Sequence, residues 1–250
     1  MSNKILVFKH MPSQNPGVFR SFAQQQNVQF TEIDLHAGDA IPNLREFDGL
    51  WVMGGSMNVW DEQLYPWLVE EKRAIRFAVD VLKMPFLGIC LGHQLLAQAM
   101  GGTVEATQQH EVGLFQIKPT EDGVGHPLLA NLPQPSVWVN VHMAAVTQKP
   151  EHAIILAKSE ACHNQIMQVG LNAYSCQFHP EVCSHTVSGW MQIPGIPEAL
   201  QKLLGMDGLA HFKASVADGL GQHNVAALQL FENWNRLVFD TGPERATAMS

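Results

Sequence analysis

The chain has 250 residues, of which 46% are hydrophobic and 15% charged, and its formal net charge is −8 at pH 7. A chain of this length can bury a large core within one α/β domain, and its negative charge argues against nucleic acid or a membrane surface as the main partner. No apolar stretch reaches the roughly 18 residues that a transmembrane helix needs. The N-terminal segment MSNKILVFKH has neither a signal-peptide nor an anchor pattern, and four cysteines without paired spacing indicate a reducing, cytoplasmic compartment.

Short apolar runs alternate with helical patterns along the N-terminal part of the chain. Strands are expected at 4–8, 28–34 and 49–53, with a helix at 17–26. A longer helical pattern runs from Leu64 to Leu82 and leads through a Met-Pro pair into a further strand. This alternation predicts a three-layer fold, in which helices cover both faces of an open, mostly parallel sheet.

The pattern changes after residue 103. From there to residue 177 the sequence is rich in strand-like runs and poor in helical ones, which predicts hairpins and an antiparallel extension of the sheet. Helical patterns return at 197–204, 209–218 and 225–239. No linker or repeat divides the chain, so we expect a single domain over 1–250, with 190–250 as a helical C-terminal extension.

A cysteine lies at the centre of the segment Gly88-Ile-Cys90-Leu-Gly92, between a strand-like and a helix-like run. This is the pattern of a nucleophile elbow with sulfur in place of oxygen. Glycines on both sides relieve the crowding of such a turn, because a Cβ there would clash. The following helix, at 92–100, would direct its amides and its positive dipole end at the sulfur, which favours the thiolate.

A candidate base for this nucleophile follows a later strand, in the run Gln-Phe-His179-Pro-Glu181. In an extended chain, side chains two residues apart point the same way, so Glu181 can orient the His179 ring. Cysteine, histidine and glutamate would then form a triad. A solvated ion pair at a strand end is the plainer alternative. A metal site that adds Cys183 and His185 matches no tetrahedral zinc pattern, so no metal is expected.

The segments GICLGHQLLAQAMGG and QFHPEV resemble the two signature segments of class I glutamine amidotransferases, and Gly54-Gly55 in LWVMGGSMNVWDE resembles the oxyanion loop of that family. The resemblance runs from residue 4 to residue 182, in the order that the family has. Without a fused synthetase, the chain is most similar to the stand-alone, GMP synthase-like group. The resemblance implies the flavodoxin-like sheet of this family.

The resemblance also implies roles. Cys90 would attack the side-chain amide of glutamine and form a γ-glutamyl thioester, with His179 as the acid and base and Glu181 as its orienting partner. Backbone N–H groups of Gly55 and Leu91 would hold the oxyanion. No cofactor is needed for this acyl transfer. The remaining residues at family positions, which would contact the substrate, are Gly54, Gln94 and His142.

Two departures from the family pattern affect the substrate pocket. Many members have a His-x-Asp segment where this chain has His142-Met-Ala144, so the acid is missing, and the oxyanion loop reads Gly-Gly-Ser instead of Gly-Gly-Pro. The leading hypothesis is a glutaminase that delivers ammonia to an acceptor enzyme or domain, such as a synthetase partner. A cysteine hydrolase of another γ-glutamyl peptide or amide is the second hypothesis, and a non-catalytic binding module on the same fold is the third.

Overall fold

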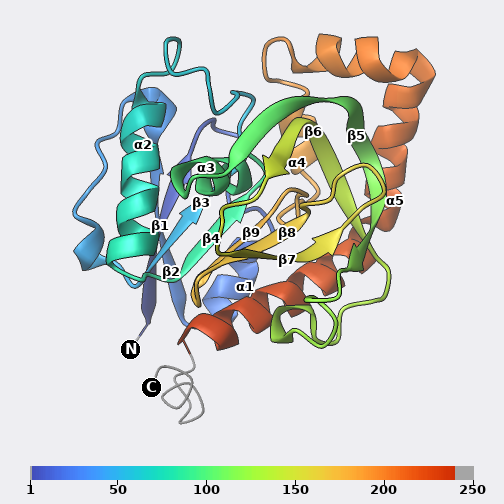
Figure 1. Ribbon diagram of the computed structural model, residues 1–250. Coiled ribbons are helices and arrows are strands. Elements are labelled where there is room, and N and C mark those ends of the chain that lie inside the picture. The colour runs from blue at the N-terminus through green and yellow to red at the C-terminus, as the bar shows by residue number, and fades with distance from the viewer. Residues whose placement is uncertain (1, 240–250) are drawn as a thin grey trace.

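The structure, a computed structural model, describes residues 2–239 (Figure 1). One sheet runs through it in the strand order β2-β1-β3-β4-β9-β8-β7-β5-β6. The strands are β1 (Asn3–Lys9), β2 (Val28–Asp34), β3 (Gly49–Val52), β4 (Phe86–Ile89), β5 (Thr103–Pro119), β6 (Ser136–Gln148), β7 (Ala153–Lys158), β8 (Ile166–Val169) and β9 (Ala173–Cys176). The α-helices are α1 (Phe19–Gln25), α2 (Trp67–Arg76), α3 (Leu91–Ala99), α4 (Thr186–Trp190) and α5 (Ile196–Phe239). The shorter turns are η1 (Leu35–Ala37), η2 (Leu44–Glu46), η3 (Phe77–Val81) and η4 (Pro127–Leu129).

The sheet has a parallel part and an antiparallel part, as the sequence predicts. Strands β2, β1, β3, β4 and β9 pair in parallel, whereas β9 pairs with β8, and β8 with β7, in antiparallel fashion. β5 continues the antiparallel part and forms a long hairpin with β6. The carboxyl ends of β4 and β9 therefore lie side by side, which is the edge where open α/β sheets place ligands.

The central strands bury both of their faces, because their apolar side chains alternate between two hydrophobic clusters. On β1, Ile5 and Val7 belong to one cluster, while Leu6 and Phe8 belong to the other. Side chains of α2 and α3 fill the second cluster. This arrangement is the three-layer architecture that the strand and helix pattern predicts.

The first cluster is closed by α1 and the last turns of α5, which Figure 1 shows along the sheet in red. Trp234 of α5 packs edge-on against Trp51 at 5.3 Å between ring centroids, and its Nε1 donates a hydrogen bond to the carbonyl of Phe86. α5 is broken at Gly205, whose φ of 73° lies in the left-handed region. The C-terminal half of α5 contributes side chains to the first cluster and so covers the core. The sequence pattern places this half in a helical extension.

No helix among residues 2–239 has the length and apolar character that a membrane crossing requires.

Candidate active site

Cys90 lies in a strained turn between β4 and α3. Its φ of 53° and ψ of −103° are outside the regions that a side chain with a Cβ ordinarily adopts, and it is the residue that caps the N-terminus of α3. The sharp strand-to-helix turn predicted from the sequence is thereby confirmed. The turn leaves the sulfur next to the positive end of the α3 dipole, where negative charge is stabilised.

The two flanking glycines are required by close backbone contacts. A Cβ on Gly92 would lie 2.1 Å from the carbonyl oxygen of Val52, and one on Gly88 would lie 2.6 Å from the carbonyl oxygen of Gly92. Any larger residue at either position would therefore push α3 away from β3 and β4. The spacing of glycines around Cys90 is thus a consequence of how tightly the turn is packed.

His179 and Glu181 follow β9, and they are brought together as the sequence predicts. His179 Nδ1 lies 2.7 Å from Glu181 Oε1, and each side chain is 2% exposed. The His179 ring also lies edge-on to Trp190, at 4.9 Å between centroids. A buried carboxylate on Nδ1 fixes the orientation of the ring and leaves Nε2 to face the sulfur.

The surroundings of His179 determine its protonation. Burial lowers the pKa of His179, but the charges of Glu181 and Cys90, together with hydrogen bonds to both, raise it to about 10. The imidazole is therefore a cation at neutral pH. A positive ring hydrogen-bonded to a cysteine sulfur can supply a proton to a leaving group and can hold negative charge on the sulfur.

Cys90 also opens onto a pocket of about 110 Å³. The thiol lies 3.9 Å from the carbonyl oxygen of Val141, and the Gln177 amide nitrogen lies 3.7 Å from the sulfur. Trp190 and Ile193, from α4 and the loop after it, also line the pocket. A small molecule in this pocket would therefore meet both the sulfur and apolar side chains.

The candidate oxyanion residues lie around this pocket. Gly55 and Leu91 both line it together with Cys90. A Cβ on Gly55 would lie 2.6 Å from Leu91 Cδ2, and one on Gly54 would lie 3.2 Å from His179 Cε1. The Gly54-Gly55 loop therefore lies beside both the residue after Cys90 and the candidate base.

The other candidate substrate residues make contacts within the protein. Gln94 Nε2 donates to the carbonyl of Ala144 at 2.9 Å and to Gln177 Oε1 at 3.0 Å. His142 Nδ1 lies 3.2 Å from the same carbonyl, and its Nε2 lies 2.9 Å from Glu111 Oε2. All three of Gln94, His142 and Ala144 line the pocket. These polar contacts hold the pocket wall in place.

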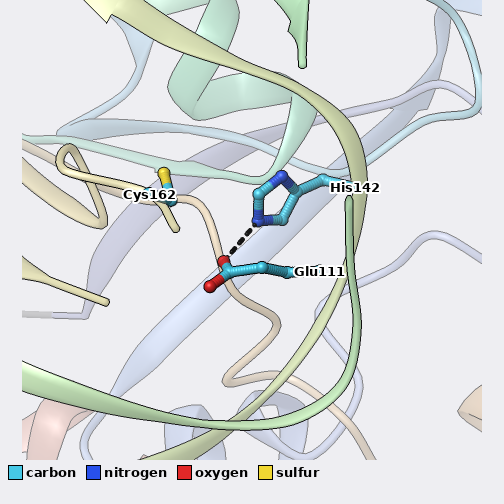
Figure 2. A group of neighbouring side chains, drawn as sticks. All are labelled: Glu111, His142 and Cys162. Carbon is cyan, nitrogen blue, oxygen red and sulfur yellow. Dashed lines mark hydrogen bonds and ion pairs between the residues drawn. The ribbon is translucent and has the colours of Figure 1, made fainter. Parts of the chain in front are cut away.

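Glu111, His142 and Cys162 form a second group of cysteine, histidine and glutamate (Figure 2). Each offers one atom that could bind a metal ion, and these atoms lie within 4.8 Å of one another. The Glu111 carboxylate accepts hydrogen bonds from His142, from the Ser159 hydroxyl at 2.6 Å and from the Gln165 amide at 2.6 Å. The carboxylate is therefore satisfied by protein donors alone.

Cys162 differs from Cys90 in reactivity. Burial, with a smaller effect from the charge of Glu111, raises the pKa of the Cys162 thiol to about 12. A thiol that stays protonated is a poor nucleophile. Cys162 is also absent from the residues that line the pocket. The second group is therefore best described as a hydrogen-bonded network that supports the wall carrying His142.

Several residues of the site were missed by sequence reasoning. Gln177 could have been found, because it lies two residues before His179 in an extended run and so shares its side of the chain. Glu111, Ser159 and Gln165 carried no local signal, since their contacts join distant parts of the chain. A further unpredicted pair, His10 with Glu71, lies behind the Gly54-Gly55 loop.

Comparison with known proteins gives these features a family context. Residues 18–189 match the family model described as "Glutamine amidotransferase class-I". A relative named glutamine amidotransferase-like protein YfeJ, from Salmonella typhimurium, is 30% identical over 90% of this chain and 88% of its own length. A glutamine-hydrolysing GMP synthase subunit from Pyrococcus abyssi is 39% identical over 44% of this chain and 57% of its own length.

Solved structures agree with the fold. A glutamine amidotransferase from Thermotoga maritima superposes with a TM-score of 0.83 at 23% identity, covering 96% of this chain and 99% of that one. A glutamine amido transferase from Methylobacillus flagellatus gives a TM-score of 0.78 at 25% identity, over 95% and 96% of the two chains. The family match over most of the chain, together with an elbow cysteine at the carboxyl edge of the sheet, leads to one conclusion. The chain belongs to the class I glutamine amidotransferase family.

Proposed function

We propose that the protein hydrolyses the side-chain amide of glutamine through a covalent thioester on Cys90 and releases glutamate and ammonia. The observation that carries this proposal is the strained Cys90 turn at the mouth of a pocket, next to a buried His179-Glu181 pair. Such a turn holds a nucleophile where a substrate can reach it, and the paired histidine supplies the proton transfers.

The first half-reaction forms the thioester. The Cys90 thiolate attacks the carboxamide carbon, and the carbonyl oxygen becomes an oxyanion held by the N–H groups of Gly55 and Leu91. When the tetrahedral intermediate collapses, the C–N bond breaks and the His179 imidazolium gives its proton to the departing nitrogen, so that ammonia leaves. The raised pKa of His179 supports this role, because the ring is charged before the reaction starts.

The second half-reaction restores the enzyme. His179, now neutral, accepts a proton from a water molecule that attacks the thioester carbon. The C–S bond breaks, glutamate leaves, and the Cys90 thiolate is regenerated beside the imidazolium. Glu181 stabilises the charged ring and keeps its Nε2 directed at the sulfur throughout.

A second candidate is a hydrolase of another γ-glutamyl amide or peptide, and the composition of the pocket favours it. None of the described residues that line the pocket is acidic, and Ala144 stands where the family resemblance leads us to expect Asp. The α-ammonium group of free glutamine would then depend on neutral acceptors, and an uncompensated charge in a partly buried pocket is costly. A substrate whose amino group is blocked avoids this cost.

The fate of the ammonia is also a proposal. Several relatives are named as one subunit of a glutamine-hydrolysing GMP synthase, and such a name describes one part of an assembly. By analogy we propose that an ammonia-accepting synthetase partner binds this chain.

All four cysteines are free, which supports a reducing, cytoplasmic compartment for the protein.

The test is a release assay that reads ammonia and glutamate separately for glutamine, small γ-glutamyl amides and γ-glutamyl peptides. Equal release of ammonia and glutamate from glutamine supports the first candidate. Turnover of γ-glutamyl peptides that exceeds turnover of glutamine supports the second. If protein that is folded and whose thiol is free turns over neither substrate class, the chain has no acyl-transfer activity on its own, which favours a binding role.

A further inference from the structure

A second buried histidine-carboxylate pair lies behind the candidate oxyanion loop, outside the proposed triad. His10 follows β1, and Glu71 belongs to α2; both side chains are 0% exposed. His10 Nε2 lies 2.8 Å from Glu71 Oε1, and Nδ1 lies 2.8 Å from the carbonyl oxygen of Gly54. Trp67 stacks on the ring at 5.5 Å with an interplanar angle of 11°. The ring is therefore fixed on both edges and on one face.

The partners of His10 determine its charge. A carbonyl oxygen and a carboxylate oxygen can only accept hydrogen bonds, so both ring nitrogens must carry hydrogen. Burial lowers the pKa of His10, but the charge and hydrogen bond of Glu71, with the backbone of Gly54 and Met53, raise it above the ordinary value. His10 is thus a buried cation whose counter-charge is Glu71, and one of its two N–H groups is directed at the Gly54-Gly55 peptide.

The geometry of that peptide connects His10 to the pocket. The bond between Gly54 and Gly55 is trans, because the only cis peptide among the described residues joins Gln134 to Pro135. In a trans peptide the C=O and the N–H point in opposite directions. A carbonyl that is held toward His10 therefore directs the Gly55 N–H away from His10.

Gly55 lies between the histidine and the elbow. A Cβ on Gly55 would be 3.1 Å from His10 Cβ and 2.6 Å from Leu91 Cδ2. Gly55 also lines the pocket together with Cys90 and Leu91, so an N–H that points away from His10 can be directed into the pocket. A hydrogen bond from a cation to the Gly54 carbonyl also polarises the peptide, which makes its N–H a stronger donor.

We propose that His10, held by Glu71, is a positioning residue that locks the Gly54-Gly55 peptide in the orientation in which the Gly55 N–H stabilises the oxyanion. This inference rests on the proposed acyl-transfer function and deepens it. A purely structural pair, which only ties α2 to the end of β1, is the alternative that the experiment must separate.

The experiment compares two variants of similar side-chain volume, both carrying Glu71→Gln so that no buried charge is left unpaired. In His10→Asn, the amide nitrogen can take the place of Nδ1 and donate to the Gly54 carbonyl. In His10→Leu, no donor remains. Four quantities are measured for each variant: kcat and KM on the best amide substrate, the rate at which iodoacetamide alkylates Cys90, and the thermal unfolding midpoint.

The leucine variant should lose about 100-fold or more in kcat, as expected when an oxyanion donor is lost, with little change in KM. The kcat of the asparagine variant should be at least about tenfold higher than that of the leucine variant. Alkylation should proceed at the wild-type rate within a few-fold in both, because displacement of iodide develops no oxyanion.

Equal kcat values in the two variants would overturn the proposal, and so would a parallel fall of kcat and alkylation. If the leucine variant does not fold, the asparagine variant decides, since a kcat below about 1% of wild type with normal alkylation would contradict positioning through the Gly54 carbonyl. A wild type that is alkylated but turns over no amide would instead remove the proposed function itself, and this proposal with it.

Discussion

Two buried groups of cysteine, histidine and glutamate lie within residues 2–239, and their surroundings differ although their residue types are the same. Cys90 occupies a strained turn at a helix N-terminus and opens onto a pocket, with His179 and Glu181 beside it. Cys162 lies in a buried network with His142, and its thiol pKa is raised to about 12. Under the proposed function, residue types alone do not distinguish the nucleophile. Backbone strain, access and a charged partner distinguish Cys90 from Cys162.

The acidic partners show the same contrast. One oxygen of Glu181 bonds His179, and its second side-chain oxygen has no hydrogen-bond partner among the described residues. Both oxygens of Glu111 are engaged, and three donors surround it. A fully satisfied carboxylate rigidifies a wall, whereas a carboxylate dedicated to one imidazole stabilises the charge of that ring.

The largest expected effect separates the two cysteines. Cys90→Ala should abolish turnover, by about 10⁴-fold or more, because no other group can form the thioester. Cys162→Ala should keep kcat within a few-fold, since Cys162 is not among the residues that line the pocket. Steady-state assays on both variants, with circular dichroism to verify folding, measure the difference. An inactive but folded Cys162→Ala protein would invert the roles assigned to the two groups.

The next effect separates the two glutamates. Glu181→Gln should lower kcat by about 10²-fold to 10⁴-fold and leave weak activity, because the base remains while its orientation and charge are less well stabilised. Glu111→Gln should instead cost about 1–3 kcal/mol of unfolding free energy. The new amide nitrogen is a donor, and it would face one of the buried donors that now bond the Glu111 carboxylate. Kinetics and urea unfolding of both variants distinguish these outcomes. A larger catalytic loss from Glu111→Gln than from Glu181→Gln would contradict the roles assigned to them.

A third prediction tests the pocket wall that the second group supports. Ala144→Asp should improve glutamine binding by about 1–3 kcal/mol if the new carboxylate reaches the α-ammonium group as a charge-assisted hydrogen bond. Ala144→Asn is the matched control, because it adds similar volume without charge. KM for glutamine measures the effect. Strong wild-type turnover of glutamine, with no gain in the aspartate variant, would show that another acceptor already serves this group.

The pH dependence of stability should contain contributions of opposite sign from two buried histidines. The pKa of His179 is raised to about 10, so its stabilising contribution is complete below about 6.5 and is lost as the pH rises through 10. Burial and the neighbouring His142 lower the pKa of His93 to about 3. Between about pH 6.5 and pH 3, His93 is protonated in the unfolded chain but neutral in the folded protein. The free energy of unfolding therefore falls as the pH drops through this range.

Urea unfolding across pH checks both signs. His179→Gln should flatten the alkaline slope, and His93→Gln should flatten the acid slope, each relative to wild type. The histidines are replaced by Gln because this side chain keeps hydrogen-bonding groups and has no group that titrates in this pH range. An alkaline slope that survives in His179→Gln would mean that the ring is not the cation described here.

Much of the site could be predicted because its signals are local. The glycines around Cys90 reflect clashes within a few residues and across two neighbouring strands, and His179 with Glu181 needs only the two-residue period of an extended chain. The division of the sheet into parallel and antiparallel parts could also be predicted, because the local sequence pattern changes after residue 103.

The rest depends on long-range contacts that no local period encodes. Glu111 meets His142 across the β5-β6 hairpin only because the register shifts between Ala106 and Glu111. His10 meets Glu71 from a different element, 61 residues away. These partners come together through the assembled fold, so a single sequence offers no periodicity that would pair them.

The assignment of Cys90 as the nucleophile is tested most directly by peptide mapping with mass spectrometry after reaction with a glutamine-mimicking electrophile. We expect one adduct per chain, on the peptide that carries Cys90, and protection of that thiol by excess substrate. An adduct on the peptide of Cys162, Cys176 or Cys183, with Cys90 unmodified, would contradict the assignment.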